Sequence, residues 1–138
     1  MHGSALLEAR GHAPPEPRLH QHVLPGGWEV LAGHSDDDNE RLTFKVARQD
    51  DWWFHVRGMP GSHVVLRSRP GEAPDRATLK AAAAIAAWYS KARAGGEVAV
   101  SCTLVKNVSK PRGVKRGTVE IRRETVLKVR PGLPEERL

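Results

Sequence analysis

The run DDWWFHVRGMPGSHVVLR, residues 50–67, decides the fold because strict alternation meets a turn signal there. Residues 52–57 alternate with a period of two, which is typical of a half-buried strand. One predicted face carries Trp52, Phe54 and Val56, and we expect it to feed the core. The opposite face carries Trp53, His55 and Arg57.

The break GMPG at 58–61 and the second run SHVVLR at 62–67 predict a β-hairpin. Pairing symmetric about Met59 would place His55 opposite His63, and Trp53 opposite Val65. The shared face would also carry Arg57 and Arg67. A slip of one residue would put the two histidines on opposite faces.

Shorter patterns on either side predict further elements. WEVLA at 28–32 and EVAVSCTLV at 97–105 alternate like strands, while GTVEIRRETVLKV at 117–129 predicts a hairpin turning near Arg123 and Glu124. The acidic run 36–38 suits the start of a short helix better than a calcium or magnesium site, because it lacks the alternate spacing of a calcium loop.

The segment TLKAAAAIAAWYSKARAGG, residues 78–96, predicts one long alanine-rich helix. Thr78 or Asp75 can cap its start, and Gly95 can end it. A stripe of small residues would let it lie close against a sheet: Ala82, Ala83 and Ala86, extended by Leu79 and Tyr89.

Together these elements predict an α+β fold: a single compact domain with a mixed sheet of five or six strands, one long Ala-rich helix and one short helix. We expect a disordered arm over residues 1–25, the domain over 26–131 and a flexible tail over 132–138. The sequence shows no long apolar run and no secretory signal. The single cysteine, Cys102, has no internal disulfide partner, so we expect a buried thiol in a cytoplasmic protein without membrane contact.

The net charge of +6 is concentrated near the C-terminus. Residues 1–100 hold 12 basic and 12 acidic side chains, whereas residues 101–138 hold 10 basic and 4 acidic ones. The segment 106–116 contains five basic residues and no acidic one. Such asymmetry favours a polyanionic partner, most simply RNA or DNA, although a solvated basic loop would look the same.

Catalytic patterns are sparse. His55 and His63, with Asp50 or Asp51, could act as acid, base or metal ligands, but a third zinc ligand is not evident. The N-terminal histidines are irregularly spaced, and neither a nucleophile turn nor a P-loop is present. We therefore expect no catalytic residue, no cofactor and no metal. The face with Trp53, His55 and Arg57 suits base stacking and phosphate pairing better, although Trp53 would equally suit a core.

Three blocks then carry a resemblance: NERLTFKVARQDDWWFHVRGMPGSHVVLR (39–67), AAAAIAAWYSKAR (81–93) and VKNVSKPRGVKRGTVEI (105–121). Together they resemble the NFACT-R domain, the C-terminal RNA-binding module of NFACT proteins of ribosome-associated quality control, a group once labelled fibronectin-binding-protein-like. The match runs over residues 33–131. It implies a small mixed α/β domain that binds RNA or the ribosome. The large members help to add C-terminal tails to stalled chains on large ribosomal subunits, and this chain resembles the stand-alone versions, which are suspected to act in RNA metabolism.

Carried over by position, the family's W-F-H block is residues 53–55, its G-S-H block is residues 61–63 and its K-P pair is residues 110–111. Two positions depart from the usual pattern. His34 stands where the family often has arginine, and Ser109 stands where it often has lysine. Both departures lower the local positive charge.

We therefore expect an RNA-binding module with ribosomal RNA or tRNA as partner, and with the large ribosomal subunit as a further candidate. The predicted RNA-binding residues are Trp53, His55, Arg57, Gly61, Ser62, His63, Arg67, Lys106, Lys110, Arg112, Lys115 and Arg116. Two alternatives stay open. One is an enzyme or accessory subunit of RNA modification that uses His55 and His63, and the other is a module that docks on a ribosomal protein.

Overall fold

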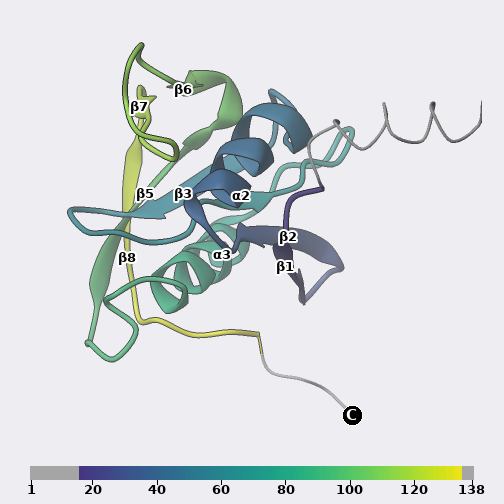
Figure 1. Cartoon of the computed structure of the whole chain (residues 1–138). Helices are drawn as coiled ribbons and strands as arrows, with labels where there is room; N and C mark the ends of the chain where they lie inside the picture. Colours follow the sequence, from purple (N-terminus) through teal and green to yellow (C-terminus); the bar gives the residue numbers. More distant parts are fainter. Residues whose placement is uncertain (1–15, 135–138) are drawn as a thin grey trace, which may run out of the picture.

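The computed structural model describes residues 16–134 and places six strands in one sheet, in the order β1-β2-β4-β3-β5-β8 (Figure 1). The strands are β1 (Leu19–Leu24), β2 (Trp28–Gly33), β3 (Trp52–Val56), β4 (Val64–Leu66), β5 (Val98–Leu104) and β8 (Thr125–Val129). A separate two-stranded ribbon pairs β6 (Val108–Ser109) with β7 (Glu120–Ile121). The helices are α2 (Asp36–Arg41), which runs into the π-helical turn η1 (Leu42–Val46), α3 (Arg76–Trp88) and the 3-10 turn η2 (Val105–Asn107).

The predicted hairpin and its register are confirmed. Trp53 pairs with Val65 and Trp52 with Leu66, which is the pairing symmetric about Met59. The α+β class is confirmed as well, and the sheet has six strands where five or six were predicted. The sheet is not mixed, however, because every pairing within it is antiparallel.

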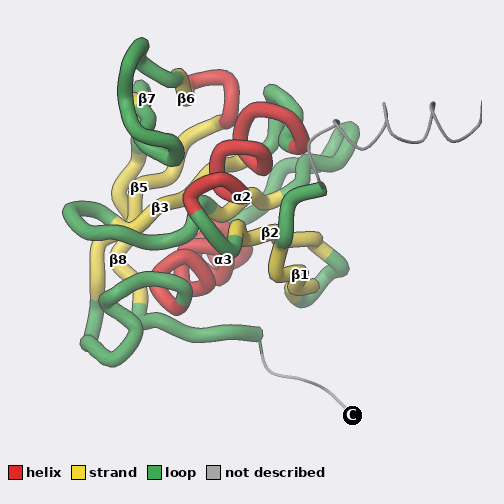
Figure 2. Tube along the Cα trace, in the orientation of Figure 1, coloured by secondary structure: helices red, strands yellow, loops and turns green. Residues whose placement is uncertain are grey.

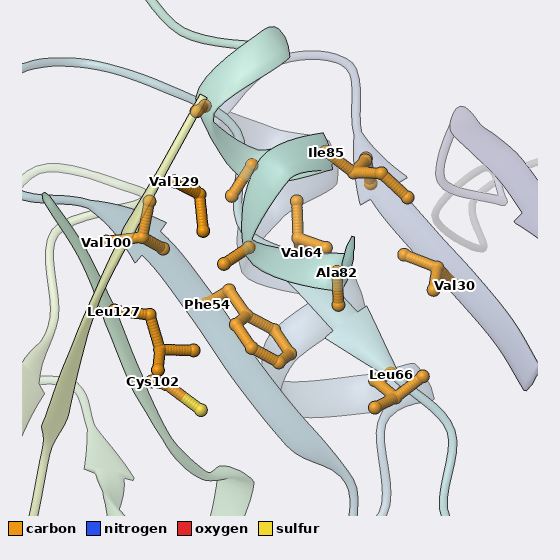
Figure 3. Packing of buried hydrophobic residues seen from close by; sticks show 14 of the residues in the cluster. Val30, Phe54, Val64, Leu66, Ala82, Ile85, Val100, Cys102, Leu127 and Val129 are labelled. Carbon is orange, nitrogen blue, oxygen red and sulfur yellow. The ribbon is translucent and has the colours of Figure 1, made fainter. Parts of the chain in front are cut away.

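One face of the sheet is covered by α3, and this side holds the larger core. Phe54 lies fully buried in it, beside Val64 and Leu66 of β4. Figure 3 shows the Phe54 ring among these strand residues, with Ala82 of α3 close above it. The alanines at 82, 83 and 86 are all buried, so their small side chains let the helix approach the strands.

The opposite face is also covered, and it forms a second core. Trp53 and Val65 point into it together with Leu31, as expected for residues one position out of phase with Phe54 and Val64. Leu42 of η1 and Val105 of η2 close this core from outside the sheet. Figure 2 shows the short helical turns above the sheet and α3 below it. Both faces of the central strands are therefore buried.

The long helix starts as predicted and ends early. The Asp75 side chain accepts a bond from the Thr78 amide, so Asp75 is the cap. The helix stops at Trp88 and not near Gly95. The chain leaves it because Ser62 N–H donates to the Tyr89 carbonyl, while Ser90 Oγ donates to the Ala87 carbonyl. Contacts to the hairpin thus replace the last predicted turns.

Two further predictions were wrong. Residues 19–24 form strand β1 although we assigned them to a disordered arm; the remainder of that arm up to residue 15 and the tail from 135 lie outside the described residues. Gly26 and Gly27, both with positive φ, make the turn that folds β1 back on β2. The segment 117–129 is not a hairpin, because Arg123, with φ of 57°, sends β7 and β8 into different sheets.

Cys102 is buried, and burial raises the pKa of its thiol to about 12, so it is a core residue. Between residues 16 and 134, no helix has both the length and the apolar character needed to cross a membrane.

Candidate nucleic-acid interface

A pocket of about 430 Å³ opens beside the β3–β4 hairpin, and we call it the first pocket. The hairpin supplies one wall through His55 and residues 56–61. The segment 115–119 supplies the facing wall. Its first two residues, Lys115 and Arg116, end the predicted basic segment, residues 106–116, which we call the basic loop. Ser101 and Glu124 close it from the β5–β8 side. The hairpin, β5 and the stretch 115–124, which are distant in sequence, therefore meet here.

The floor of the first pocket is a chain of hydrogen bonds between buried side chains. Trp53 Nε1 donates to Thr43 Oγ1 over 3.2 Å, and Thr43 Oγ1 lies 2.8 Å from His63 Nδ1. His63 Nε2 lies 2.9 Å from the Gly117 carbonyl, which can only accept, so this nitrogen carries the proton. Thr43 then donates to Nδ1, and each group in the chain has a partner.

These hydrogen bonds and the burial of their members correct the predictions that Trp53 and His63 contact RNA. Trp53 and His63 are each only 2% exposed, so neither presents a ring face on which a base could stack. Burial, followed by the neighbouring His55, lowers the pKa of His63 to about 4. The neutral His63 therefore joins the hairpin to Gly117, the residue that follows the basic loop. The expected pairing of His55 with His63 is confirmed, because their ring centroids lie 5.7 Å apart.

His55 is the predicted aromatic residue that remains within reach of a ligand. Its ring lies 5.9 Å from the Trp53 ring in a stacked arrangement and meets His63 edge-on. It lines the first pocket and is only half-buried. Burial lowers the pKa of His55, while hydrogen bonds to the Gly61 and Val56 backbone oppose this shift. The group is thus a neutral ring near pH 7, suited to hydrogen bonding or packing against a base.

The basic loop is held against α2 by ion pairs that the sequence did not predict. Lys110 Nζ lies 2.9 Å from Glu40, Lys115 Nζ lies 3.6 Å from Asp36, and Arg116 Nε lies 3.5 Å from Asp37. The predicted capping also holds, because Ser35 Oγ accepts from the Asp38 amide at the start of α2. A complementary acidic run and basic run were visible in the sequence, but nothing local indicated that they meet.

Glu40 has the most connections in this arrangement. Both of its carboxylate oxygens accept from Lys110, and one of them also accepts from the Gly117 amide over 3.0 Å. The hydrogen bond from Lys110 is the largest cause that lowers the pKa of Glu40. Glu40 and His63 therefore hold Gly117 from two sides, and they fix the wall of the first pocket.

The other predicted cations differ in whether they have an ion-pair partner and in whether they line the first pocket. Lys106 and Arg112 are exposed, and neither has an ion-pair partner within residues 16–134. Arg57 lies 3.7 Å from Glu124 at the mouth of the first pocket and remains half exposed. Arg67 instead pairs with the buried Asp51 over 3.3 Å and does not line the pocket. We therefore remove Arg67 from the candidate interface.

The remaining predicted residues have structural roles. Ser62 Oγ donates to the Gly33 carbonyl over 2.6 Å. A Cβ added to Gly61 would lie 2.9 Å from the Ser90 Cβ, so the hairpin can pair with the segment after α3 only because residue 61 has no side chain. Two residues of the pocket wall were not among the predicted ones: Ser101, whose hydroxyl donates a hydrogen bond, and Glu124, whose carboxylate accepts it. Ser101 lies in β5 and Glu124 directly precedes β8, and neither stands in a distinctive motif.

Within the described part of the chain, no three His, Cys, Asp or Glu side chains are grouped so that they could hold a metal ion. Asp51, considered as a partner of the histidines, accepts from the Arg48 and Ser68 amides instead. What the first pocket offers is a neutral imidazole, backbone groups at glycines, and cations at its edge. Such a set suits a nucleotide.

Comparisons with known proteins agree with this geometry. A family model described as "NFACT protein RNA binding domain" matches residues 20–123. The chain is 42% identical over 106 residues to "Rqc2 homolog RqcH" of Bacillus subtilis (strain 168), which covers 77% of this chain and 18% of the relative. It is 36% identical over 115 residues to the protein of the same name in Streptococcus pneumoniae (serotype 2, strain D39), covering 83% of this chain and 20% of the relative. The chain thus spans about a fifth of the length of these curated relatives.

A solved structure shows the same fold. It is described as "the C-terminal of the fibronectin/fibrinogen-binding protein from Streptococcus suis (FBPS)", and it superposes with a TM-score of 0.78 at 34% sequence identity. The alignment covers 88% of this chain and 47% of that one.

Proposed function

The chain belongs to the family of NFACT RNA-binding domains, and on this premise we propose that it binds RNA through the first pocket and the basic loop. The main support for this proposal is that one pocket is lined by His55, Arg57 and the loop cations Lys115 and Arg116. A nucleotide placed there meets a neutral ring and backbone groups inside, and cations at the rim. Phosphate contacts supply most of the affinity of such surfaces, while contacts inside the pocket select the base.

We further propose ribosomal RNA or tRNA as the partner, in ribosome-associated quality control within the cytoplasm. The supporting observation is the similarity to proteins named "Rqc2 homolog RqcH". Contact with the large ribosomal subunit is part of this proposal. Crosslinking the protein to RNA in cells and sequencing the attached RNA would test it. Reads enriched in ribosomal RNA or tRNA support the proposal, and reads that match total RNA abundance contradict it.

We propose a binding role and not a catalytic one. Both ring nitrogens of His63 are already engaged, by Thr43 and by the Gly117 carbonyl. A general acid or base needs a nitrogen that can reach the substrate. His55 alone does not make a catalytic pair.

The direct test replaces both Lys106 and Arg112 with alanine and measures RNA affinity by fluorescence anisotropy between about 50 and 300 mM salt. These two cations are exposed and have no ion-pair partner within residues 16–134, so their removal should leave the fold intact. We expect weaker binding and a salt dependence that is flatter by about one to two units of log affinity per log salt.

Replacing Arg76 and Lys80 together provides a control, because it also removes two positive charges. Both residues lie on α3, which covers the other face of the sheet. This control should bind RNA as the unmodified protein does. An equal loss in both double variants would show that only total charge matters, and it would remove the basic loop from the interface.

A further inference from the structure

A second pocket, of about 370 Å³, adjoins the first pocket. Asp36, Asn39, Pro60 and Gly61 line both of them. Pro60 and Gly61 at the tip of the hairpin therefore belong to the boundary between the two pockets. A flexible polymer that occupies the first pocket has a continuous path into the second.

The second pocket contains a stack of three rings that come from different elements. The His20 ring of β1 lies 4.2 Å from the Tyr89 ring at the end of α3, with an interplanar angle of 11°. The His20 ring also stacks with the His34 ring, at a centroid distance of 5.2 Å and an interplanar angle of 28°. Pairing of β1 with β2 places Leu19 opposite Gly33, which brings His20 beside His34. We call these three rings the ring stack.

The ring stack is held in place at its inner end and open at its outer end. His22 Nε2 lies 2.8 Å from the Tyr89 hydroxyl, which fixes the tyrosine ring. His20 and Tyr89 are half-buried, whereas His34 is exposed. The solvent-facing end of the ring stack is thus the imidazole of His34. This side chain is exposed and is not part of either hydrophobic core.

Charges around the ring stack favour an anion over a cation. Lys91 and Arg93 line the second pocket from the segment after α3, and Asp36 is the one carboxylate in its lining. The Arg93 guanidinium lies 4.4 Å above the Trp88 ring, and its Nε donates to the Trp88 carbonyl, so its position is set. Lys91 is exposed. Rings suited to stacking next to cations suited to phosphate are the features of single-strand nucleic-acid sites.

We propose that single-stranded RNA passes from the first pocket over Pro60–Gly61 into the second pocket, where one base stacks on His34 and its phosphate meets Lys91 and Arg93. This inference rests on the proposed function and adds a second, separate nucleotide site to it. His34 is the last ring of the stack Tyr89–His20–His34, so a base that stacks on it would extend the stack by one ring. Stacking requires a ring face and not a particular base, so this site should tolerate all four bases.

Protonation offers a second readout of the same site. The pKa of His20 is lowered by burial, and then by His34 and His22. A phosphate close to the ring stack would stabilise the protonated form of His20, as the Asp36 carboxylate does. The cations Lys91 and Arg93 act in the opposite direction. RNA binding should therefore raise the pKa of His20. By linkage, RNA affinity should increase as the pH falls through that pKa.

The test measures the affinity of a fluorescein-labelled oligoadenylate of about ten nucleotides by anisotropy, for the unmodified chain and two variants. His34→Ala removes the open ring face, and we expect roughly tenfold weaker binding. His34→Phe keeps a ring without a titratable nitrogen, and we expect affinity near that of the unmodified chain. Lys80→Ala, nine residues before Tyr89 on α3 and hence roughly 13 Å along the helix axis, is the control and should change nothing.

The outcomes separate this inference from the proposed function. If the unmodified chain binds the oligonucleotide and the loss of Lys106 and Arg112 weakens it, while His34→Ala does not, the second site is refuted and RNA binding stands. If His34→Phe binds as weakly as His34→Ala, stacking is refuted as well. If the unmodified chain binds no RNA, both proposals fail. Nuclear magnetic resonance titration of the His20 ring with and without the oligonucleotide must also show the upward pKa shift.

Discussion

Lys110 and Glu40 stand 70 positions apart in the chain, yet Lys110 Nζ donates to both carboxylate oxygens of Glu40 at 2.9 Å. The same carboxylate accepts from the Gly117 amide. One acidic residue of α2 thereby holds both ends of the segment 110–117. The wall of the first pocket is therefore tied to α2 through this carboxylate.

Replacing Glu40 with glutamine should loosen that wall. We expect a loss of about 1 kcal/mol in the free energy of unfolding, because glutamine removes the ion pair with Lys110 at a partly exposed site and leaves one acceptor oxygen where the carboxylate has two. Amide hydrogen exchange at Gly117 should accelerate by more than the change in global stability explains. Glu72→Gln is the matched control, since Glu72 belongs to an exposed ion pair with Arg69. Unchanged exchange at Gly117 would show that Glu40 does not hold the loop.

The contribution of Glu40 also has a pH dependence with a definite sign. Its pKa in the folded protein is lowered below the ordinary 4.5, mainly by Lys110. Its stabilising effect is therefore complete above the ordinary pKa, and it is lost as the pH falls through the lowered value. Glu40→Gln should remove this part of the acid dependence.

His63 predicts a loss of stability in mildly acidic solution. Its pKa is lowered from 6.5 to about 4, so the unfolded chain takes up a proton that the folded one refuses. The contribution of His63 is complete above pH 6.5 and declines toward pH 4, by roughly 3 kcal/mol in total. Urea unfolding between pH 4 and 7.5 measures it. His63→Gln should be less stable at pH 7 and should show a flatter pH dependence. An equally steep curve would mean that another group titrates.

Trp53 should behave as a core residue in spite of its place in the W-F-H block. Trp53→Ala should cost about 3–5 kcal/mol, the usual range for a buried aromatic side chain. Trp53→Phe should cost much less, because Thr43 can still donate to His63. RNA affinity of the folded Trp53→Phe variant should equal that of the unmodified chain. A clear loss of affinity at unchanged stability would restore Trp53 to the interface.

Gly33 should tolerate no side chain. A Cβ there would lie 2.0 Å from Asn39 Oδ1, the atom that accepts from the His63 amide. Gly33→Ala should therefore displace Asn39 and destabilise the domain by about 3 kcal/mol or more. Gly96→Ala is the control, since no atom lies within 4 Å of its added Cβ. Similar melting temperatures of both variants would contradict the expectation.

The hairpin was predictable because its signals are local. Period-two alternation before GMPG and the apolar run after it predicted the strands, the turn and the register that places His55 next to His63. The burial of Trp53 was not predictable in the same way. Alternation separates two faces, but it does not tell which face meets solvent, and here Leu42 and Val105 cover the second face from distant parts of the chain.

Two other errors share this cause. β1, with the sequence LHQHVL, lacks a regular alternation of apolar and polar residues and gains its order from full pairing with β2, so its own sequence looks like a loose arm. The split of β7 from β8 depends on the positive φ of Arg123, a conformation that arginine rarely adopts and that no composition rule predicts. Family resemblance gave the class of ligand, while the ion pairs between α2 and the basic loop came only from the structure.

The contacts of Lys110, Lys115 and Arg116 with α2 have a consequence for thermodynamics. These cations already possess counterions, which are carboxylates of the same chain and cannot diffuse away. A phosphate that binds them exchanges one anion for another and releases fewer small ions than a count of basic residues suggests. The displaced carboxylates stay close and repel the incoming strand. Binding would therefore favour an RNA whose shape keeps its phosphates near the cations and away from Asp36, Asp37 and Glu40.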